Sequence, residues 1–272
     1  MKLLHFYLIL LFPFLPFVSL SQDHRAEIHC KHWLGGYPYG TPATNDLIIR
    51  DIYALSNNDD TKFADWVAYR LDPELISGSN KSRKWKADPW LDPSETLEPE
   101  PHHGDYKNAY DSIHTDRGHQ APLGSLDGSP FWYEANYLSN ITPQKSDLNQ
   151  GAWVTLEEKV RSMVNKYKVV YVMTGPLYER EMPPLPFADE PHKVPSGYWK
   201  IILVEMENGH IEPLAFIFDQ DTPRGSALQN HLYTIDDVEL RSHLDFLWEL
   251  SDYKEKAIEA NKNEDWFEIN IK

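Results

Sequence analysis

The chain has 272 residues, of which 41% are apolar and 13% aromatic; this is enough for one large domain or two small ones with a packed core, and it argues against disorder. The formal net charge of −16 argues against the chain-wide basic surface with which many proteins hold DNA, so any nucleic-acid site must be a local basic patch. The single cysteine, Cys30, excludes an intramolecular disulfide.

The N-terminus has the composition of a signal peptide. One lysine precedes an apolar run over residues 3–20, and Ser19 and Ser21 are small residues at the −3 and −1 positions of the expected cleavage point. A transmembrane anchor is the alternative because the run is near spanning length, but its prolines and its small-residue end favour cleavage. We predict a signal peptide over residues 1–21, a single domain over residues 22–272, a secreted or periplasmic location, and no membrane association after cleavage.

The first third of the domain combines an irregular arm, a hairpin and a basic cluster. Residues 22–45 are rich in Gly, Pro and Tyr, which predicts the arm. Residues 47–56 and 63–71 have strand patterns, and the turn residues between them predict a hairpin. Residues 77–86 then concentrate positive charge around a tryptophan, in Lys81, Arg83, Lys84, Trp85 and Lys86. Such a run is often only a solvated face, but in a chain this acidic it is also where a phosphate backbone would dock.

A polar stretch over residues 115–161 carries most of the candidate chemistry. Residues 113–119 are predicted to form a strand that ends on the sequence Asp-Arg-Gly-His, and a long loop follows. Ser146 or Asp147 can cap a helix. The helix has an apolar stripe, predicted as core, in Trp153, Leu156, Val160, Met163, Val164 and Tyr167. Asn149 and Glu157 are placed along one side of this helix near its start.

The remaining elements predict an antiparallel sheet. Residues 169–174 have the pattern of a buried strand ended by Gly175-Pro176, and residues 198–206 and 211–218 are two strands joined across Asn208-Gly209. A last amphipathic helix is predicted from Asp236 to about Leu250, and the tail over residues 251–272 receives no assignment. Antiparallel hairpins with inserted helices indicate an α+β fold.

His119 and Asn149 together indicate metal-assisted chemistry. A neutral imidazole is the usual group for taking a proton from water near pH 7. An Asn carbonyl oxygen, with waters and a phosphate oxygen, suits Mg²⁺, and a ligand set of this kind also accepts Mn²⁺. Glu157 could hold a metal-bound water, and Arg83 and Arg117 could stabilise negative charge in a transition state. Taken singly, however, His119 reads as a satisfied loop histidine and Asn149 as a helix cap.

Longer motifs carry a resemblance to a known family. They include Asp116–Leu123, Asn136–Trp153 and Thr174–Arg180, and also residues 63–69, 83–86, 195–200 and 218–223. In these segments the chain resembles the DNA/RNA non-specific endonuclease family of the ββα-metal type, and the resemblance covers roughly residues 45–250. It implies a central antiparallel sheet flanked by helices, with a strand–loop–helix metal finger. The segment after about residue 250 does not match, and the disulfides known in the family cannot form here.

The resemblance also implies roles for individual residues. His119 matches the general base, Asn149 the magnesium ligand, and Glu157 the carboxylate that orients metal-bound water. The other matching positions are the phosphate-contacting Arg83, the supporting Arg117, and Asn140 and Arg161 on the substrate side. The expected activity is hydrolysis of DNA and RNA to 5′-phosphorylated products, and a homodimer is an allowed assembly.

Two other functions stay open at this point. One is a non-catalytic nucleic-acid- or metal-binding protein on a nuclease scaffold, for which loss of His119 or Asn149 would be expected, and both are present. The other is a phosphodiesterase for small diesters, which a comparison of long DNA with a small diester would separate.

Overall fold

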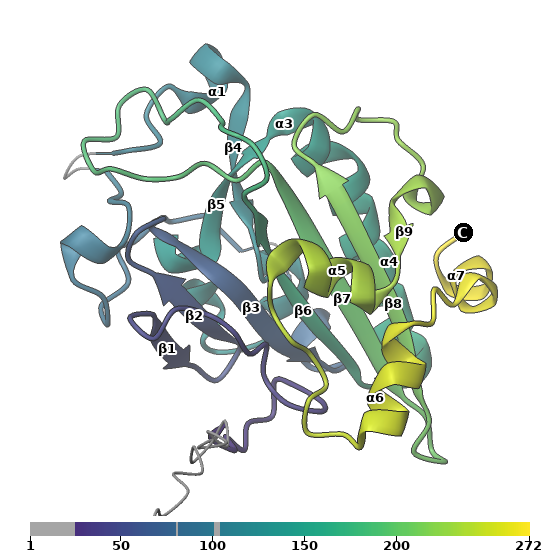
Figure 1. Ribbon diagram of the computed structural model, residues 1–272. Coiled ribbons are helices and arrows are strands. Elements are labelled where there is room, and N and C mark those ends of the chain that lie inside the picture. The colour runs from purple at the N-terminus through teal and green to yellow at the C-terminus, as the bar shows by residue number, and fades with distance from the viewer. Residues whose placement is uncertain (1–24, 80, 101–103) are drawn as a thin grey trace, which may run out of the picture.

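The computed structural model describes residues 25–79, 81–100 and 104–272, so the predicted signal peptide and the first residues of the arm lie outside the described residues. The chain is built around a seven-stranded sheet in which every neighbouring pair is antiparallel (Figure 1). In spatial order the strands are β1 (Asp46–Ile49), β2 (Ala54–Asn58), β3 (Phe63–Leu71), β6 (Val170–Leu177), β7 (Gly197–Glu205), β8 (Ile211–Asp219) and β9 (Leu232–Tyr233).

The expected hairpin is a three-stranded meander, so this prediction was wrong in one detail. Residues 47–56 contain both β1 and β2, because a turn interrupts them at residues 50–53. The Arg50 N–H donates to the Tyr53 carbonyl (2.8 Å), and the buried Arg50 guanidinium turns away to pair with Asp88. The turn contains neither Gly nor Pro, and it brings the Arg50 side chain to this distant ion pair.

Strand β6 also runs further than expected. Gly175 and Pro176 were predicted to end it, yet both pair with β7, opposite Trp199 and Tyr198. The β3 ladder ends at Thr174, so from there β6 is paired on one side only. A proline is tolerated in a strand where one side is free of ladder bonds.

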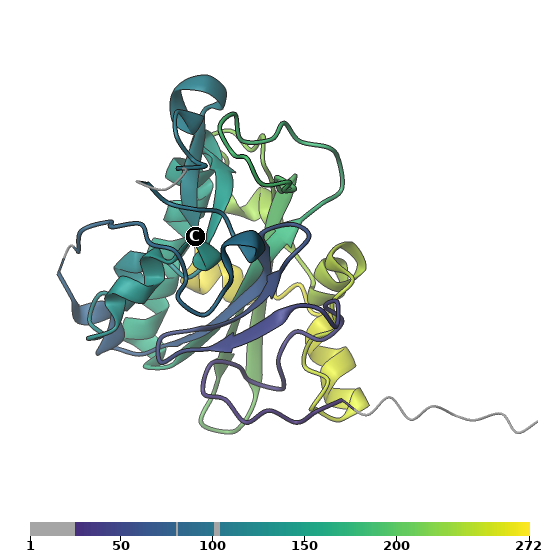
Figure 2. The ribbon, with the colours of Figure 1, turned by 90° about the vertical axis from the view of Figure 1, so that its left-hand side faces the viewer.

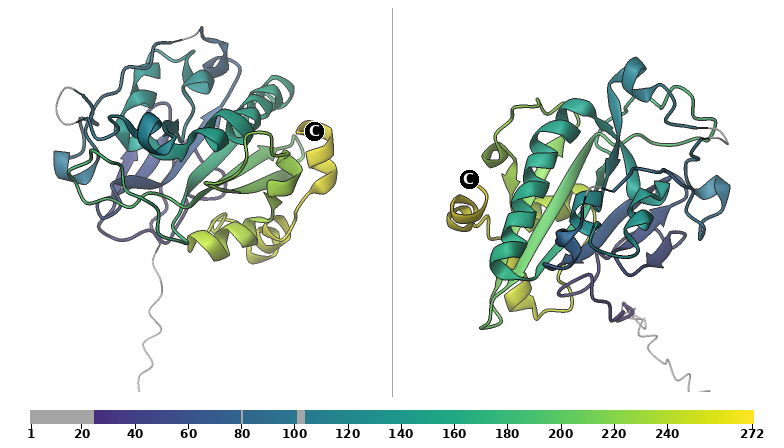
Figure 3. Two further views of the ribbon diagram at one scale, coloured as in Figure 1. Left: turned by 90° about the horizontal axis from the view of Figure 1, so that it is seen from above. Right: turned by 180° about the vertical axis from the view of Figure 1, so that it is seen from behind.

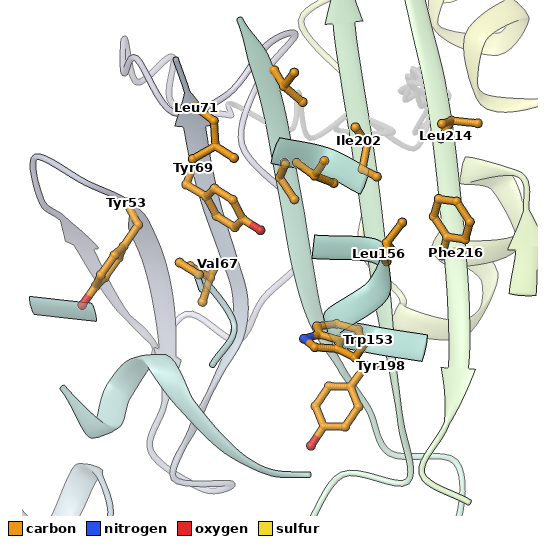
Figure 4. Close-up of a cluster of buried hydrophobic side chains, with 14 of the residues drawn as sticks. Tyr53, Val67, Tyr69, Leu71, Trp153, Leu156, Tyr198, Ile202, Leu214 and Phe216 are labelled. Carbon is orange, nitrogen blue, oxygen red and sulfur yellow. The ribbon is translucent and has the colours of Figure 1, made fainter. Parts of the chain in front are cut away.

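Helices cover both faces of the sheet. Helix α4 (Val154–Tyr167) lies along one face, and α5 (Ile235–Ser242) and α6 (Asp252–Glu259) lie on the other (Figures 1 and 3). The predicted stripe of α4 is core: Trp153 and Leu156 project onto Tyr198 and Ile202 of the sheet (Figure 4). Burial on both sides explains why β7 reads as a continuous apolar run. The predicted α+β architecture, a central antiparallel sheet flanked by helices, is confirmed.

The C-terminal region differs from the predicted single helix over residues 236–250. Helix α5 begins after Thr234, whose side chain forms a capping box with Asp237, and it ends at His243 in a left-handed conformation (φ 60°). The unassigned tail forms α6 and then α7 (Glu264–Asn270). Phe267 of α7 is buried in the core on the α4 face. No described helix combines the length and apolar character needed to cross a membrane.

A separate two-stranded hairpin carries the polar stretch. Strands β4 (Thr115–His119) and β5 (Ile141–Lys145) pair antiparallel, with the short helix α1 (Ala109–Ile113) at one end and α2 (Leu123–Leu126) in the loop between them. The hairpin lies at one end of the large sheet (Figures 1 and 2). It is fixed there because the Pro143 carbonyl accepts hydrogen bonds from Tyr198 Oη (2.8 Å) and Gln220 Nε2 (2.7 Å). Helix α3 (Ser146–Leu148) follows directly, which completes a ββα unit.

Candidate active site

A cleft of about 1040 Å³ lies between the ββα unit, the start of α4 and the segment around Arg83. Six of the seven predicted site residues line it: Arg83, Arg117, His119, Asn149, Glu157 and Arg161. These residues are up to 78 positions apart along the sequence, from 83 to 161, so the fold gathers them. Trp85, Tyr106 and Asp116 also line the cleft.

Strand β4 presents two of these side chains on one face. Arg117 and His119 are two positions apart, and alternate residues of a strand point to the same side. Gly118 lies between them, opposite Thr142, where an added Cβ would lie 2.7 Å from the Gln144 Cβ. The close approach of the two strands therefore requires glycine at this position.

His119 is held in one tautomer by a buried amide. Its Nε2 lies 3.3 Å from Oδ1 of Asn136, a residue that is 0% exposed, and the ring lies 5.3 Å from that of Trp85. An amide oxygen can only accept, so Nε2 carries the proton and Nδ1 keeps its lone pair. Within the described chain Nδ1 has no hydrogen-bond partner. Burial, with a smaller contribution from the Arg83 charge, lowers the pKa of His119 to about 4, so the ring is neutral at pH 7.

Asp116 fixes the orientation of Asn149. Its carboxylate accepts hydrogen bonds from Ser146 Oγ (2.9 Å), Asn149 Nδ2 (2.8 Å) and Gln150 Nε2 (2.8 Å). Because Nδ2 is engaged, the Asn149 Oδ1 is the end of the amide left for the cleft. An oxygen ligand held in this way fits a hard cation such as Mg²⁺, which needs few protein oxygens.

The helix that carries Asn149 is irregular at this point. Residues Asn149–Trp153 form a π-helical turn between α3 and α4, with Gly151 outside helical geometry (φ −118°, ψ −114°). An added Cβ on Gly151 would lie 2.4 Å from the main-chain oxygen of Arg224, so only glycine lets that loop approach. Arg224 in turn bonds Asp147 and the Gln150 side chain. Such π turns are frequent at functional sites, and this one sets the position of Asn149.

Behind Glu157 lies a buried lysine. Lys200 of β7 is 0% exposed; its ammonium lies 4.2 Å from the centre of the Trp153 ring and 3.4 Å from the Tyr69 hydroxyl. Burial lowers the pKa of Lys200 to about 8. Burial also raises the pKa of Glu157, while Lys200 and Arg161 act against that rise. The lysine therefore helps to keep Glu157 ionised from the side away from solvent.

Three arginines face the cleft with free charge. Arg117 lies 5.5 Å from the centre of the Trp85 ring and 5.3 Å from that of Tyr106, and Arg161 donates to Ser125 Oγ (3.3 Å). In the described part of the chain no carboxylate lies within ion-pair distance of Arg83, Arg117 or Arg161. Guanidinium groups without a carboxylate partner are well suited to phosphate oxygens.

The structure places Asn140 differently from the expectation that it binds substrate. Asn140 is 0% exposed, and its amide forms hydrogen bonds only with main-chain groups among the described residues. Its Nδ2 donates to the carbonyls of Ala121 and Ala135, and its Oδ1 accepts from the Ala121 N–H, all at 2.9 Å. It holds the loop after β4 in place. The sequence analysis did not select two residues that contact the site. Asn136 is the partner of His119, and Asp116 is the partner of Asn149. Both lie within the quoted motifs, but nothing in the sequence shows which asparagine faces His119.

Comparison with known proteins places the chain in a family. Residues 34–252 match the family described as DNA/RNA non-specific endonuclease. The chain belongs to this family. It is 46% identical over 215 residues to the Nuclease of Serratia marcescens, covering 78% of each chain. It is 29% identical over 225 residues to mitochondrial Endonuclease G of Homo sapiens, covering 77% of this chain and 72% of that one. The predicted family is confirmed, and the protein is a hydrolase that acts on DNA and RNA.

Solved structures show the same fold. A chain from the crystal structure of the EndoG/EndoGI complex superposes with a TM-score of 0.63 at 22% identity, covering 79% of this chain and 91% of that one. The family is one of metal-dependent nucleases. The Asn149 Oδ1, which is left for the cleft because Asp116 engages Nδ2, is consistent with metal dependence.

Proposed function

We propose that the protein is a secreted, Mg²⁺-dependent, sugar-non-specific endonuclease whose reaction takes place in the cleft between β4 and α4. The observation that supports this most is that His119 and Asn149 line the same cleft, each with one polar atom held by a protein partner and the other left free. His119 keeps the Nδ1 lone pair because Asn136 occupies Nε2, and Asn149 keeps Oδ1 because Asp116 occupies Nδ2. Both side chains line the same cleft.

His119 is proposed as the general base. A neutral imidazole can take a proton from water at Nδ1 as that water attacks phosphorus. The Asn136 amide oxygen would then stabilise the imidazolium, because it accepts the Nε2–H. The Trp85 ring, tilted by 40° against the imidazole, limits its rotation, so the Nδ1 lone pair keeps its direction toward the cleft.

Asn149 Oδ1 is proposed as the protein ligand of the metal ion. Bound there with waters, Mg²⁺ would polarise the phosphate and neutralise the leaving oxygen. Glu157, from the first turn of α4, lines the same cleft. Its carboxylate would accept hydrogen bonds from cleft waters and orient them. Mn²⁺ has the same preference for oxygen ligands and is expected to replace Mg²⁺.

The arginines are proposed to bind the scissile phosphate and its neighbours. Arg83 and Arg117 would stabilise the additional negative charge of the transition state, and Arg161 would contact a neighbouring phosphate. None of these contacts reads the sugar 2′ position, which suits a nuclease that accepts both DNA and RNA. Attack by water opposite the 3′-oxygen would leave 5′-phosphorylated products, as the family resemblance implies.

A metal-dependent cleavage assay tests the proposal. Purified protein is incubated with supercoiled plasmid and with RNA, in MgCl₂ or in EDTA. Cleavage of both substrates in Mg²⁺ alone is expected, and intact nucleic acid in Mg²⁺ would refute the activity. Faster turnover of a small diester than of long DNA would favour the small-diester phosphodiesterase instead. Binding without cleavage would favour the non-catalytic alternative.

The role of His119 has its own test. His119→Ala is expected to lose at least about 100-fold in rate, which is the usual scale for removing a general base. His210→Ala is the matched control, because His210 is exposed in the β7–β8 turn region and pairs only with Glu212 among the described residues. Near-normal turnover of His119→Ala would contradict the assignment.

Export and assembly complete the proposal. Cleavage after residue 21 predicts a mature protein that begins at Gln22, which mass spectrometry of exported material would show. A homodimer is proposed because α5, α6 and α7 expose the large apolar residues Leu240, Tyr253 and Ile269. Light scattering at several protein concentrations would detect it, and a single monomer mass throughout would exclude it.

A further inference from the structure

Three carboxylates converge at the β1–β2 end of the large sheet, where the edge strand β1 lies (Figure 1). Asp46 comes from β1, Asp59 from the turn after β2, and Glu95 from the short 3₁₀ turn at Pro93–Glu95. One oxygen from each carboxylate lies within 4.8 Å of the others. Three segments distant in sequence thus bring negative charge to one point.

A buried amide group lies beside the same cluster. Asn57 is 0% exposed, and its Nδ2 donates to the Glu95 carbonyl (2.9 Å). It also lies directly opposite Asp46 in the β1–β2 ladder, so the two side chains share one face of the sheet. The amide therefore lies between two members of the cluster. Its Oδ1 has no partner among the described residues, and neither has the buried Oδ1 of Asp59. A buried oxygen without a protein partner is one that a bound ion or water can satisfy.

The nearby positive charge does not satisfy these oxygens. The Lys62 ammonium donates to main-chain carbonyls, those of Asp59 and Ser94 (2.6 Å to the latter), and among the described residues it forms an ion pair with no carboxylate. The cluster thus holds more negative charge than its surroundings neutralise.

We propose that Asp46, Asp59, Glu95 and the Asn57 Oδ1 form a Ca²⁺-binding site. All four donors are oxygens, the ligands of a hard cation, and Ca–O distances of 2.3–2.6 Å place ligands on opposite sides of the ion up to about 5 Å apart, which matches the observed spacing. Mg²⁺ fits less well, because it requires a tighter octahedron and keeps most of its waters. None of the four residues lines the cleft, so the site is separate from the one proposed for catalysis.

The consequence of binding is a tether for the loop that leads to the cleft. Leu97, two positions after Glu95, packs with Tyr106 in one apolar cluster, and the Glu98 N–H donates to Asp105 (2.5 Å). Tyr106 forms part of the cleft wall. A cation between Glu95 and the sheet edge would therefore hold this wall, without contacting the scissile phosphate.

Thermal unfolding of the full mature chain tests the site. Protein dialysed against EDTA is melted with no cation, with 10 mM MgCl₂ or with 10 mM CaCl₂. For an affinity of about 10⁻⁴ M, Ca²⁺ is expected to raise the melting temperature by roughly 5 °C or more, and by more than Mg²⁺ does. Asp59→Asn is expected to abolish the rise. Without cation the same variant is expected to melt at or above the temperature of the unmodified chain, because a repulsive charge has been removed.

Two controls separate this site from others. Asn149→Ala removes the proposed active-site ligand and is expected to keep the full rise with Ca²⁺. Asp60→Asn makes the same charge change at an exposed neighbouring residue and should also keep it. Glu95→Gln, whose side chain can still accept from the Asp92 N–H, provides a second variant for calorimetric titration with CaCl₂. No rise in the unmodified chain, or an equal rise in Asp59→Asn and Glu95→Gln, would overturn the proposal.

Discussion

The most direct test of how the cleft is organised is the substitution Asp116→Asn. The carboxylate of Asp116 holds Asn149 through one charge-assisted hydrogen bond of 2.8 Å and accepts two more bonds from neighbouring residues. An amide of the same shape would replace the charged acceptor by a neutral one, at a cost of about 1.5 kcal/mol for the bond to Asn149. That energy corresponds to about a tenfold change in an equilibrium constant. Partners that orient a metal ligand typically contribute 10- to 100-fold to metal affinity.

The expected result is a shift in metal requirement with little change in maximal rate. Initial rates on supercoiled plasmid, measured over a series of MgCl₂ concentrations, should give a half-maximal concentration about 10- to 100-fold higher for Asp116→Asn. Asp111→Asn is the matched control, because Asp111 lines the same cleft and carries the same charge but has no hydrogen bond to Asn149. Equal shifts in the two variants would show that charge alone matters. An unchanged metal requirement in Asp116→Asn would refute the orienting role.

Three further outcomes follow from the geometry. Because burial lowers the pKa of His119 to about 4, the base stays neutral in mild acid. The acid limb of the pH profile of kcat/KM should therefore lie below pH 6.5, and an acid limb above pH 6.5 would contradict this. Lys200→Met removes the charge that holds down the pKa of Glu157, so the acid limb of kcat should move to higher pH; an unmoved limb would exclude the coupling. Gly151→Ala forces a Cβ to within 2.4 Å of the Arg224 oxygen and should lower the free energy of unfolding by roughly 1–3 kcal/mol in urea titrations; unchanged stability would show that the loop yields freely.

Local patterns predicted the elements that carry their own signal. The apolar stripe starting at Trp153 specifies α4, and the stripe is core as expected. The alternating and continuous apolar runs specify β3, β7 and β8 within a residue or two. These elements depend on neighbours that are close in sequence, which is why the pattern suffices.

Two of the differences involve partners that are distant in the sequence or in the loop after β4. The break between β1 and β2 contains Arg50, whose partner Asp88 is 38 positions away. Asn136 and Asn140 have the same side chain four positions apart, yet the first contacts His119 and the second holds main-chain groups. The sequence does not distinguish the roles of the two asparagines. The packing of the loop after β4 decides which one contacts His119.

Because the chain is acidic and its substrate is a polyanion, the charge balance of the cleft matters for substrate binding. Among the described residues, its lining has no net positive charge of its own: four cationic side chains, Arg83, Lys107, Arg117 and Arg161, are balanced by four carboxylates, Glu100, Asp111, Asp116 and Glu157. The arginines alone therefore give little attraction, although they supply geometry for phosphate. A divalent cation held by Asn149 would make the balance positive where the scissile phosphate must lie. Metal removal is thus expected to weaken nucleic-acid binding as well as stop hydrolysis, and this distinguishes the arrangement from one in which basic side chains alone hold the substrate.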